Sequence, residues 1–448
     1  MLPVLAKTLY FALQRLRREP IEAALKDVRR TEFVSSDELL AIQAERQLAQ
    51  LRFALHHVPH YQKTLAPFAD RITTAETLQD VESIVSGLPV IEKGSVTAKP
   101  EEFTSLNSRQ LATYPAKTSG SSGTPVIFPC DQVSWAYRHA LMYRCMESFG
   151  VSIGERYALF FGLHWNKQTR LKVQVRDIAF NRVRLSAYEI GPSAVETHLR
   201  RILSFRPAYF LGYPSALYDF CLLLRERGID LQDLGLKAVF VTAEPLRQVQ
   251  RALIEEVTGA RCVNTYGCAE GGMCAFECPE GALHIASEAV WLSLRTNGRS
   301  EPLAGEAVLT DMMLRAFPMI RYAMGDEVVL RPGKCSCGRP HPMLRSIEGR
   351  SGEPILLPNG RRINPNLPSY IFKPITSLGV IRRYRFVQCP AGLELWLVVS
   401  GTFQQQHLRM VEQESVKALG PGLNLKIKLV DSLPILPNAK HRDFVRAS

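Results

Sequence analysis

Residues 236–270 read LKAVFVTAEPLRQVQRALIEEVTGARCVNTYGCAE, and this stretch indicates the fold class. It opens with a short β-rich run, LKAVFV, and continues into LRQVQRALIEEV, whose apolar residues recur at helical spacing. Between residues 157 and 330, further β-rich runs such as YALFFG, AYFLGY and EAVLT alternate with helical patterns such as PSALYDFCLLLRER. Because strands that alternate with helices form βαβ units, this region is predicted to build mostly parallel sheets with packed helices.

The character of the sequence changes after the Gly-Arg-Ser-Gly of residues 349–352. Two β-rich runs, IRRYRFVQ and LELWLVVS, are followed there by the helical pattern QQHLRMVEQESVKALG and by LNLKIKLVDSL. We therefore predict an α/β protein with a large N-terminal domain, residues 1–349, and a small, mobile α+β C-terminal domain, residues 350–448.

A long amphipathic helix is expected over residues 36–60. Ser35 or Ser36 can cap its N-terminus, and Pro59 ends it. Its apolar face is predicted to hold Leu48, Leu51 and Leu55.

Residues 1–20 combine apolar and basic side chains. Lys7 interrupts the apolar stretch before it reaches the length of a signal peptide or a membrane span, so a cytoplasmic protein is expected. This segment is predicted to be a helix that docks on the body of the protein through an apolar stripe formed by Leu5, Leu9, Leu13 and Leu16. The alternative is a basic amphipathic helix on a membrane surface, and we do not expect that peripheral contact.

The composition is that of a globular chain with an excess of positive charge. The 448 residues are 46% hydrophobic, and 55 Lys and Arg stand against 43 Asp and Glu, for a formal net charge of +12. This balance suits polyanionic ligands such as ATP, coenzyme A or a nucleic acid. The sequence holds no nucleic-acid motif and no basic run longer than three residues, so a nucleic-acid partner is not expected. Nothing in the sequence indicates the oligomeric state.

Hydroxyl groups and glycines are concentrated in one short segment, Thr118, Ser119, Gly120, Ser121, Ser122, Gly123 and Thr124, just before the β-like VIFP. Glycine lets a backbone approach a phosphate closely, and consecutive N–H groups and hydroxyls supply donors around it. The segment is therefore predicted to cradle a phosphate, and the alternative is a flexible Ser/Gly loop. It is not a Walker loop, because no Gly-Lys-Ser/Thr follows.

Four later segments join this loop in a resemblance to a known family. The chain resembles the acyl-adenylate-forming superfamily, specifically its phenylacetate–CoA ligase branch and the CapK-type relatives associated with capsular polysaccharide biosynthesis, from about residue 40 to the C-terminus. TSGSSGTP looks like the family's phosphate loop, VTAEP at 241–245 like the segment that lines the adenine, and TYGCAE at 265–270 like the motif that stacks the base and holds magnesium. FPMIRYAMGD at 317–326 is similar to the segment whose last residue grips the ribose, and IEGR at 347–350 to the interdomain hinge.

This resemblance implies a site for ATP and Mg²⁺. Its nucleotide-binding residues are Thr118, Ser119, Gly120, Ser121, Ser122, Gly123, Thr124, Ala243, Glu244, Pro245, Tyr266, Gly267 and Asp326. Tyr266 offers a flat face to adenine, Asp326 can accept hydrogen bonds from the ribose hydroxyls, and Glu270 offers Mg²⁺ a hard oxygen ligand. Taken alone, each has a plainer interpretation, since Tyr-Gly can end a strand, Glu270 can be solvated and an Asp after Gly is an ordinary turn.

Three residues are expected to act on the reaction: Glu270 through Mg²⁺, Arg350 from the hinge, and Lys440. Arg350 can neutralise phosphate charge, or it can be a surface Arg paired with a Glu. Lys440 ends LPILPNAK, which resembles the terminal motif that brings a catalytic lysine into the site, although Ala439 stands where the family has glycine. A lysine beside the α-phosphate offsets charge that develops as pyrophosphate leaves, whereas most exposed lysines are simply solvated.

The reaction that the resemblance implies is that of an AMP-forming acid–thiol ligase. ATP activates a small carboxylic acid to acyl-AMP, and the acyl group then passes to a thiol, which we expect to be that of coenzyme A. One alternative is a non-CoA acceptor in capsule or exopolysaccharide biosynthesis. Another is a nucleotide-binding protein without activity. Two departures from the family favour it: Ala439, and Gly352 at the position of the family's hinge Asp.

The ten cysteines are expected to be reduced thiols, since no secretion signal is recognised. Cys278 precedes His284 by six residues, a pattern similar to that of CapK-type sequences, while Cys335 and Cys337 form a tight C-x-C. One Cys and one His from the first segment and two Cys from the second would complete a tetrahedral Zn²⁺ site.

Two alternatives to this ligand set stay open. Cys274 or His341 can replace one of the four ligands. The plainer interpretation is a set of buried thiols that bind no metal.

Overall fold

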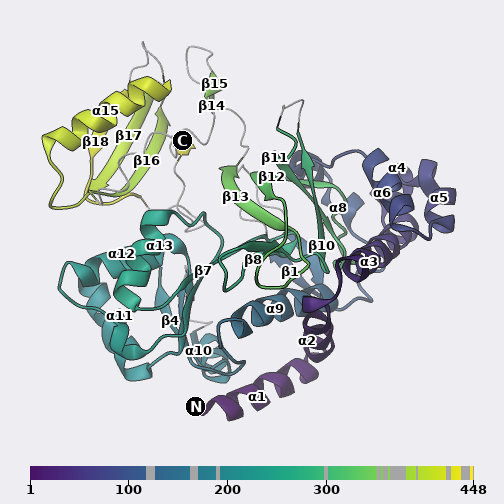
Figure 1. Ribbon diagram of the computed structural model, residues 1–448, viewed down its shortest axis with the longest axis horizontal. Coiled ribbons are helices and arrows are strands. Elements are labelled where there is room, and N and C mark those ends of the chain that lie inside the picture. The colour runs from purple at the N-terminus through teal and green to yellow at the C-terminus, as the bar shows by residue number, and fades with distance from the viewer. Residues whose placement is uncertain are drawn as a thin grey trace.

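A computed structural model describes residues 1–117, 127–161, 170–187, 192–296, 301–350, 355–356, 362–363, 380–389, 392–419, 425–434 and 444–446. A large sheet with helices around it forms the body, and a smaller sheet with helix α15 lies beside it (Figure 1). This arrangement confirms the predicted α/β class with a small α+β unit at the C-terminus.

Helices dominate the first hundred residues and then alternate with strands. The helices are α1 (Pro3–Leu16), α2 (Ile21–Arg30), α3 (Ser36–His57), α4 (Pro59–Thr64), α5 (Ala69–Thr74), α6 (Leu78–Gly87), α7 (Lys93–Ala98), α8 (Pro100–Phe103), α9 (Gln132–Glu147), α10 (Arg170–Ala179), α11 (Pro192–Phe205), α12 (Pro214–Arg225), α13 (Gln248–Thr258) and α15 (Gln405–Leu419), with short 3-10 turns at η1 (Thr31–Phe33), η2 (Ala66–Phe68) and η3 (Gln232–Leu234).

The strands of the described residues fall into one large sheet and three small ones. They are β1 (Thr113–Lys117), β2 (Ile127–Asp131), β3 (Tyr157–Phe161), β4 (Arg182–Ser186), β5 (Tyr209–Gly212), β6 (Ala238–Val241), β7 (Cys262–Cys268), β8 (Gly272–Glu277), β9 (Leu283–Ile285), β10 (Val290–Arg295), β11 (Ala304–Asp311), β12 (Tyr322–Arg331), β13 (Met343–Arg350), β14 (Ile355–Leu356), β15 (Arg362–Ile363), β16 (Ile381–Cys389), β17 (Gly392–Val399), β18 (Leu425–Leu429) and β19 (Phe444–Arg446).

The large sheet has a parallel half and an antiparallel half. Within the described residues its eleven strands follow the order β10-β11-β12-β13-β9-β8-β7-β6-β5-β3-β4. Pairing is parallel from β4 to β7 and antiparallel from β7 to β10. Parallel neighbours need a crossover helix, so parallel pairing is confined to the half in which helices separate the strands. The large sheet is therefore mixed.

The parallel half is covered on both faces. Strand β6 is buried at every position. Its residues Ala238 and Phe240 pack in one hydrophobic cluster, while Val239 and Val241 pack in another together with residues of α12 and α13. This explains why LKAVFV reads as a continuous apolar run without alternation.

The small sheet has the order β18-β17-β16-β19 and packs against α15 around a core of its own. It contacts the large body through β16, where the hydroxyl of Tyr384 accepts a 2.6 Å hydrogen bond from Arg247 and Arg383 pairs with Asp219. Strand β13, which ends at Arg350, is the last strand of the large sheet along the chain. The boundary between residues 349 and 350 stays a prediction.

Helix α3 matches the helix expected over residues 36–60. The Ser35 side chain caps it by accepting the backbone N–H of Glu38 at 3.1 Å. Leu48 and Leu51 are buried and Leu55 packs against the same cluster, while Pro59 begins the next helix.

Helix α1 docks through a different face from the one predicted. Leu5 and Leu16 are 58% and 80% exposed, whereas Ala6, Tyr10 and Gln14 are buried. The Tyr10 ring makes edge contacts with three other aromatic rings. Leucine side chains of the predicted stripe cannot make such contacts. The predicted leucine contact is therefore wrong.

No helix in the described part of the chain combines the length and the hydrophobicity that a membrane crossing requires.

Gly154 allows α1 to approach the body this closely. Its φ is +94°, and a Cβ there would lie 2.4 Å from the Pro3 carbonyl oxygen and 2.6 Å from the Lys7 nitrogen. We expect Gly154→Ala to destabilise the protein by at least about 2 kcal/mol, since it adds a backbone collision to the strain of a positive φ. Gly150→Ala is the matched control, because Gly150 has φ +74° and no atom within 4 Å of the added Cβ. Equal losses of thermal and chemical stability in the two variants would contradict a tight contact at Gly154.

Candidate functional site

The predicted adenine segment and Tyr266 meet at one edge of the parallel half-sheet. VTAEP begins with Val241, the last residue of β6, and β7 runs parallel to β6 with Val241 opposite Asn264. The Thr265 hydroxyl ties the two strands together by donating to the Val241 carbonyl at 2.9 Å. Ligands of open α/β sheets bind beyond the carboxyl ends of the parallel strands, and both segments lie at that edge.

The turn after β6 has a constrained backbone. Ala243 has φ +70°, a left-handed conformation that is uncommon for a residue with a side chain. Glu244 Oε2 accepts the backbone N–H of Ser215 at 3.1 Å, at the start of α12, where the helix dipole favours a carboxylate. Ala243, Glu244 and Pro245 are therefore held between β6 and the N-terminus of α12.

Tyr266 and Asp326 are joined directly. The Tyr266 hydroxyl donates to Asp326 Oδ2 at 2.9 Å, which links β7 to β12. Burial raises the pKa of Tyr266 well above its usual value and the charge of Asp326 raises it further, so the hydroxyl stays protonated and remains the donor. Gly267 is required beside them, because a Cβ there would lie 2.1 Å from the Gly272 carbonyl oxygen.

Glu270 is held by two residues that sequence reasoning missed. The Tyr322 hydroxyl donates to Glu270 Oε1 at 3.0 Å, and Glu270 as a residue is 6% exposed. Arg138 of α9 donates to the backbone carbonyls of Ala269 at 2.6 Å and Glu270 at 2.7 Å. Tyr322 lies inside FPMIRYAMGD, so that motif could have indicated it as a site residue. No sequence signal indicates Arg138, because the two carbonyls that it holds lie more than a hundred residues away.

The last residue of β13, Arg350, stands opposite Asp326 in the register of β12 and β13, so the backbone of the expected hinge begins beside the expected ribose ligand.

Residues 118–124 and Lys440 lie outside the described residues. The strands that flank the phosphate-loop segment are described, and they pair as a hairpin with Lys117 opposite Ile127. Asp131, at the end of this hairpin, accepts the backbone N–H groups of Arg315 at 2.7 Å and Ala316 at 2.9 Å. The end of the hairpin away from the loop is thus tied to the chain that leads into FPMIRYAMGD.

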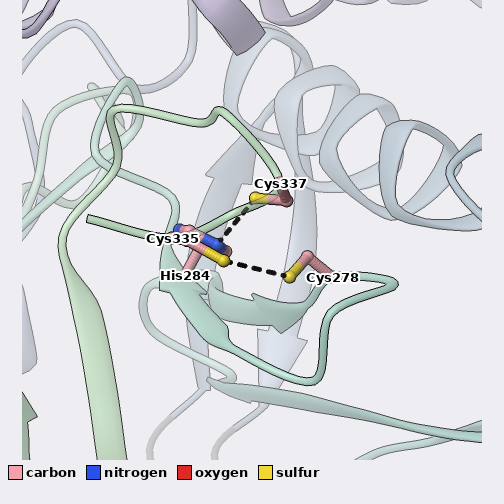
Figure 2. Close-up of side chains that lie close together, drawn as sticks. All are labelled: Cys278, His284, Cys335 and Cys337. Atoms are coloured by element: carbon pink, nitrogen blue, oxygen red, sulfur yellow. Dashed lines mark hydrogen bonds between the residues drawn. The ribbon is translucent and has the colours of Figure 1, made fainter.

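The four predicted zinc ligands come together away from this edge (Figure 2). Their ligand atoms all lie within 4.8 Å of one another. Cys278 Sγ is 3.8 Å from Cys335 Sγ, and Cys337 Sγ is 3.3 Å from His284 Nε2. Burial alone would raise the pKa of the Cys337 thiol, but hydrogen bonds from the backbone N–H and guanidinium of Arg339 outweigh burial and lower that pKa.

Known proteins share both sequence and fold with this chain. No protein-family model matches it. The phenylacetate-coenzyme A ligase of Thermus thermophilus is 23% identical over 344 residues, which are 73% of this chain and 73% of that protein. The phenylacetate-coenzyme A ligase of Aromatoleum evansii is 26% identical over 360 residues, 76% of this chain and 74% of that protein.

Among solved structures, 2-hydroxyisobutyryl-CoA ligase in its postadenylation state, in complex with 2-HIB-AMP, has a TM-score of 0.71 at 18% identity and covers 94% of this chain and 92% of its own. In the thioesterification state, with 2-HIB-AMP and CoA, the TM-score is 0.62 at 19% identity, with coverage of 93% and 91%. The phenylacetate-CoA ligases are distant homologues of this chain. Its fold is that of the adenylate-forming acyl-CoA ligases.

Behind Glu270, the chain buries an aspartate next to Arg138. Asp311 Oδ2 is 3.8 Å from Arg138 Nη2, and its Oδ1 accepts the backbone N–H groups of Met313 and Leu314. Burial raises the pKa of Asp311 from 3.8 to about 6, against the opposing attraction of Arg138.

The raised pKa of Asp311 predicts a pH dependence of stability. Between about pH 4 and pH 6 the folded chain holds a proton on Asp311 that the unfolded chain has lost, so this residue makes stability fall as pH rises through that window. Asp311→Asn keeps the acceptor for the two backbone N–H groups and removes the titration. We expect the variant to lose a pH-dependent contribution of about 2 kcal/mol between pH 4.5 and pH 7, measured by denaturant unfolding at these two pH values. Parallel pH profiles for wild type and variant would contradict the assignment.

Proposed function

We propose that the chain uses ATP to activate a carboxylic acid to acyl-AMP and then transfers the acyl group to a thiol, that of coenzyme A. The observation that carries this proposal is the hydrogen bond from Tyr266 to Asp326, which joins two motifs that lie 60 residues apart in the sequence. These are the two motifs that the family resemblance assigns to the adenine and to the ribose. A shared site for both parts of one nucleoside is the arrangement that ATP binding requires.

The nucleoside would lie across the edge formed by the ends of β6 and β7. The strained turn at Ala243 exposes backbone groups beside adenine, and the Tyr266 ring offers an apolar face for it. Asp326 would accept hydrogen bonds from the ribose hydroxyls, and the bond from Tyr266 fixes its carboxylate in advance.

Glu270 fits the role of a magnesium ligand. It supplies a carboxylate, the donor type that Mg²⁺ prefers, and Tyr322 orients it through Oε1 while Oε2 takes no part in that bond. Bound with ATP, Mg²⁺ would neutralise charge on the phosphate oxygens. The contribution of the chain is to hold this carboxylate still, through Tyr322 on the side chain and Arg138 on the backbone.

The remaining residues act on the phosphates. In the first step a carboxylate oxygen of the acid bonds to the α-phosphorus, and the bond from that phosphorus to the bridging oxygen breaks, which releases pyrophosphate. The N–H groups and hydroxyls of residues 118–124, with Lys440 and Arg350, would stabilise the charge that develops there. In the second step the thiol sulfur attacks the acyl carbon and AMP leaves.

Coenzyme A as the acceptor is supported by two observations. The relatives and the similar structures are named as CoA ligases. The chain carries a net charge of +12, which favours a polyanionic thiol. A non-CoA acceptor is the alternative that the activity assay separates.

A binding measurement tests the nucleotide site. We expect Asp326→Asn to weaken Mg·ATP binding by at least about 10-fold, because it removes a charged acceptor for hydrogen bonds. Tyr266→Phe keeps the ring and removes only the hydroxyl, so a smaller loss is expected. Titration calorimetry gives both values, with the exposed Asp233→Asn as a control that should bind like wild type. Undiminished binding by Asp326→Asn would sink the ribose assignment.

An activity screen tests the reaction. The protein is incubated with Mg·ATP and mixed carboxylic acids, with and without coenzyme A, and acyl-AMP, AMP and acyl-CoA are followed by mass spectrometry. We expect acyl-AMP without coenzyme A and acyl-CoA with it, and we expect Lys440→Ala to lose AMP formation. Acyl-AMP that never yields acyl-CoA would point to another acceptor. Full activity of Lys440→Ala would remove the catalytic role of that lysine.

A further inference from the structure

We propose that Cys278, His284, Cys335 and Cys337 bind one zinc ion, which staples the two parts of the large sheet together. This proposal is independent of the proposed enzymatic function, and its tests need no substrate. It rests on the geometry of the donors, on the fixed orientation of the histidine, and on where the four residues lie in the sheet.

Two donor–donor distances in the cluster are close to the edges of a zinc tetrahedron. With zinc–sulfur bonds of about 2.3 Å and a zinc–nitrogen bond of about 2.0 Å, the edges of a tetrahedron are about 3.8 Å between sulfurs and about 3.5 Å between sulfur and nitrogen. Here Cys278 Sγ and Cys335 Sγ are 3.8 Å apart, and Cys337 Sγ and His284 Nε2 are 3.3 Å apart. A disulfide needs sulfurs at about 2.05 Å, so Cys278 and Cys335 are not bonded to each other.

His284 is oriented as a ligand. Its Nδ1 lies 2.9 Å from the backbone carbonyl oxygen of His341, an acceptor that requires Nδ1 to carry the proton. Nε2 then presents its lone pair toward the three sulfurs. A backbone acceptor behind the imidazole is the usual support of a metal-binding histidine.

The cysteines come from two turns of the chain. Cys278 lies in the connection from β8 to β9, and His284 lies in β9 itself. Cys335 and Cys337 lie in the connection from β12 to β13 (Figure 2). Gly281 and Gly338, with φ of +78° and +83°, let these connections fold back tightly behind the cysteines. Both turns therefore present sulfur toward the same point.

The alternative ligand His341 is not one of the donors that cluster in the described residues. Its Nδ1 lies 3.4 Å from Glu288 Oε2, and Glu288 is paired with Arg144 in a fully buried site. Nδ1 of His341 thus lies beside Glu288, while the backbone carbonyl of His341 supports His284. Arg339 pairs with Glu32 and donates to Cys337, so a positive charge lies beside the thiolates.

The donor set selects the metal and its role. Three thiolates and one imidazole suit zinc among the common metals of a reduced protein. Four protein ligands fill a tetrahedron, which is typical of a structural site, whereas a catalytic site keeps a position open. Strand β8 has six residues, roughly 20 Å at about 3.3 Å per residue, and it separates Cys278 from Glu270. The metal would therefore lie away from the nucleotide site.

The position of the cluster explains what the metal would do. Strands β9 and β13 join two parts of the large sheet, one from β10 to β13 and the other from β9 to β4 in the order of the sheet. In the described chain they pair at only two positions, Met343 with His284 and Leu344 with Leu283. The cluster links the turns on both sides of this short junction. Four metal bonds there would supply the cross-link that two residue pairs provide only weakly.

Metal analysis of the purified full-length chain tests the proposal. We expect about one zinc per chain after gel filtration in metal-free reducing buffer, and at least 10-fold less in Cys337→Ala and Cys278→Ala, with a lower melting temperature. Cys389→Ala is the matched control, since Cys389 is a partly buried free cysteine in β16, and it should keep both the zinc and the melting temperature. Cobalt in place of zinc should give the intense sulfur-to-metal absorption of a tetrahedral thiolate site.

Two outcomes would overturn the zinc site. One is wild-type protein that retains less than about 0.1 zinc per chain after exposure to excess zinc and gel filtration. The other is equal zinc content in Cys337→Ala and Cys389→Ala, which would mean adventitious binding. If the ligand variants do not fold, thiol modification of wild type gives the answer, because zinc must be released in step with the modification of the cysteines.

Discussion

The hydrogen bond from Tyr266 to Asp326 spans the junction on which the whole site depends. Tyr266 lies in β7 and Asp326 in β12, and the sheet between them passes through the short pairing of β9 with β13. The two residues can share one ligand only while that junction keeps its register. The strands on one side of that junction contribute Tyr266 and the segment proposed to line adenine, and the strands on the other side contribute Asp326 and Tyr322. The site is therefore a property of the assembled mixed sheet.

The sequence predicts the elements of this sheet better than their connections. Apolar runs such as LKAVFV and helical patterns such as LRQVQRALIEEV are local signals, and both correspond to the observed β6 and α13. Ser35 capping α3 is equally local. Direction of pairing depends on how strands meet in space, so the antiparallel half from β8 to β13 was not foreseen. The face through which α1 docks depends on Gly154, a partner far along the chain, and the leucine stripe alone pointed the wrong way.

The same distinction holds for the candidate site. Motif order indicated Tyr266, Glu270 and Asp326, and the structure brings the first and last of these into contact. The sequence indicates the four zinc candidates through residue type and spacing, although their two segments are more than fifty residues apart. Cysteine and histidine side chains are the usual ligands of zinc, so their clustering in two short segments is itself a signal. Arg138 was not found, since an arginine in a helix carries no sign that it will hold two carbonyls of a distant turn. Residues that support functional groups are recognised by their partners, and the partners are visible only in three dimensions.

The hairpin of β12 and β13 connects these features mechanically. Its turn holds Cys335 and Cys337, and its open end holds Asp326 opposite Arg350. A hairpin that is anchored at its turn and paired along its length is stiff, so the position of Asp326 follows from that of the cluster. Strand β13 ends at Arg350, and Gly352 follows two residues later in the sequence. In the proposed reaction, a rotation of the small sheet would be taken up beyond Arg350, because glycine has the least restricted backbone of all residue types. The proposed nucleotide site would then stay in place while the acyl acceptor site changes.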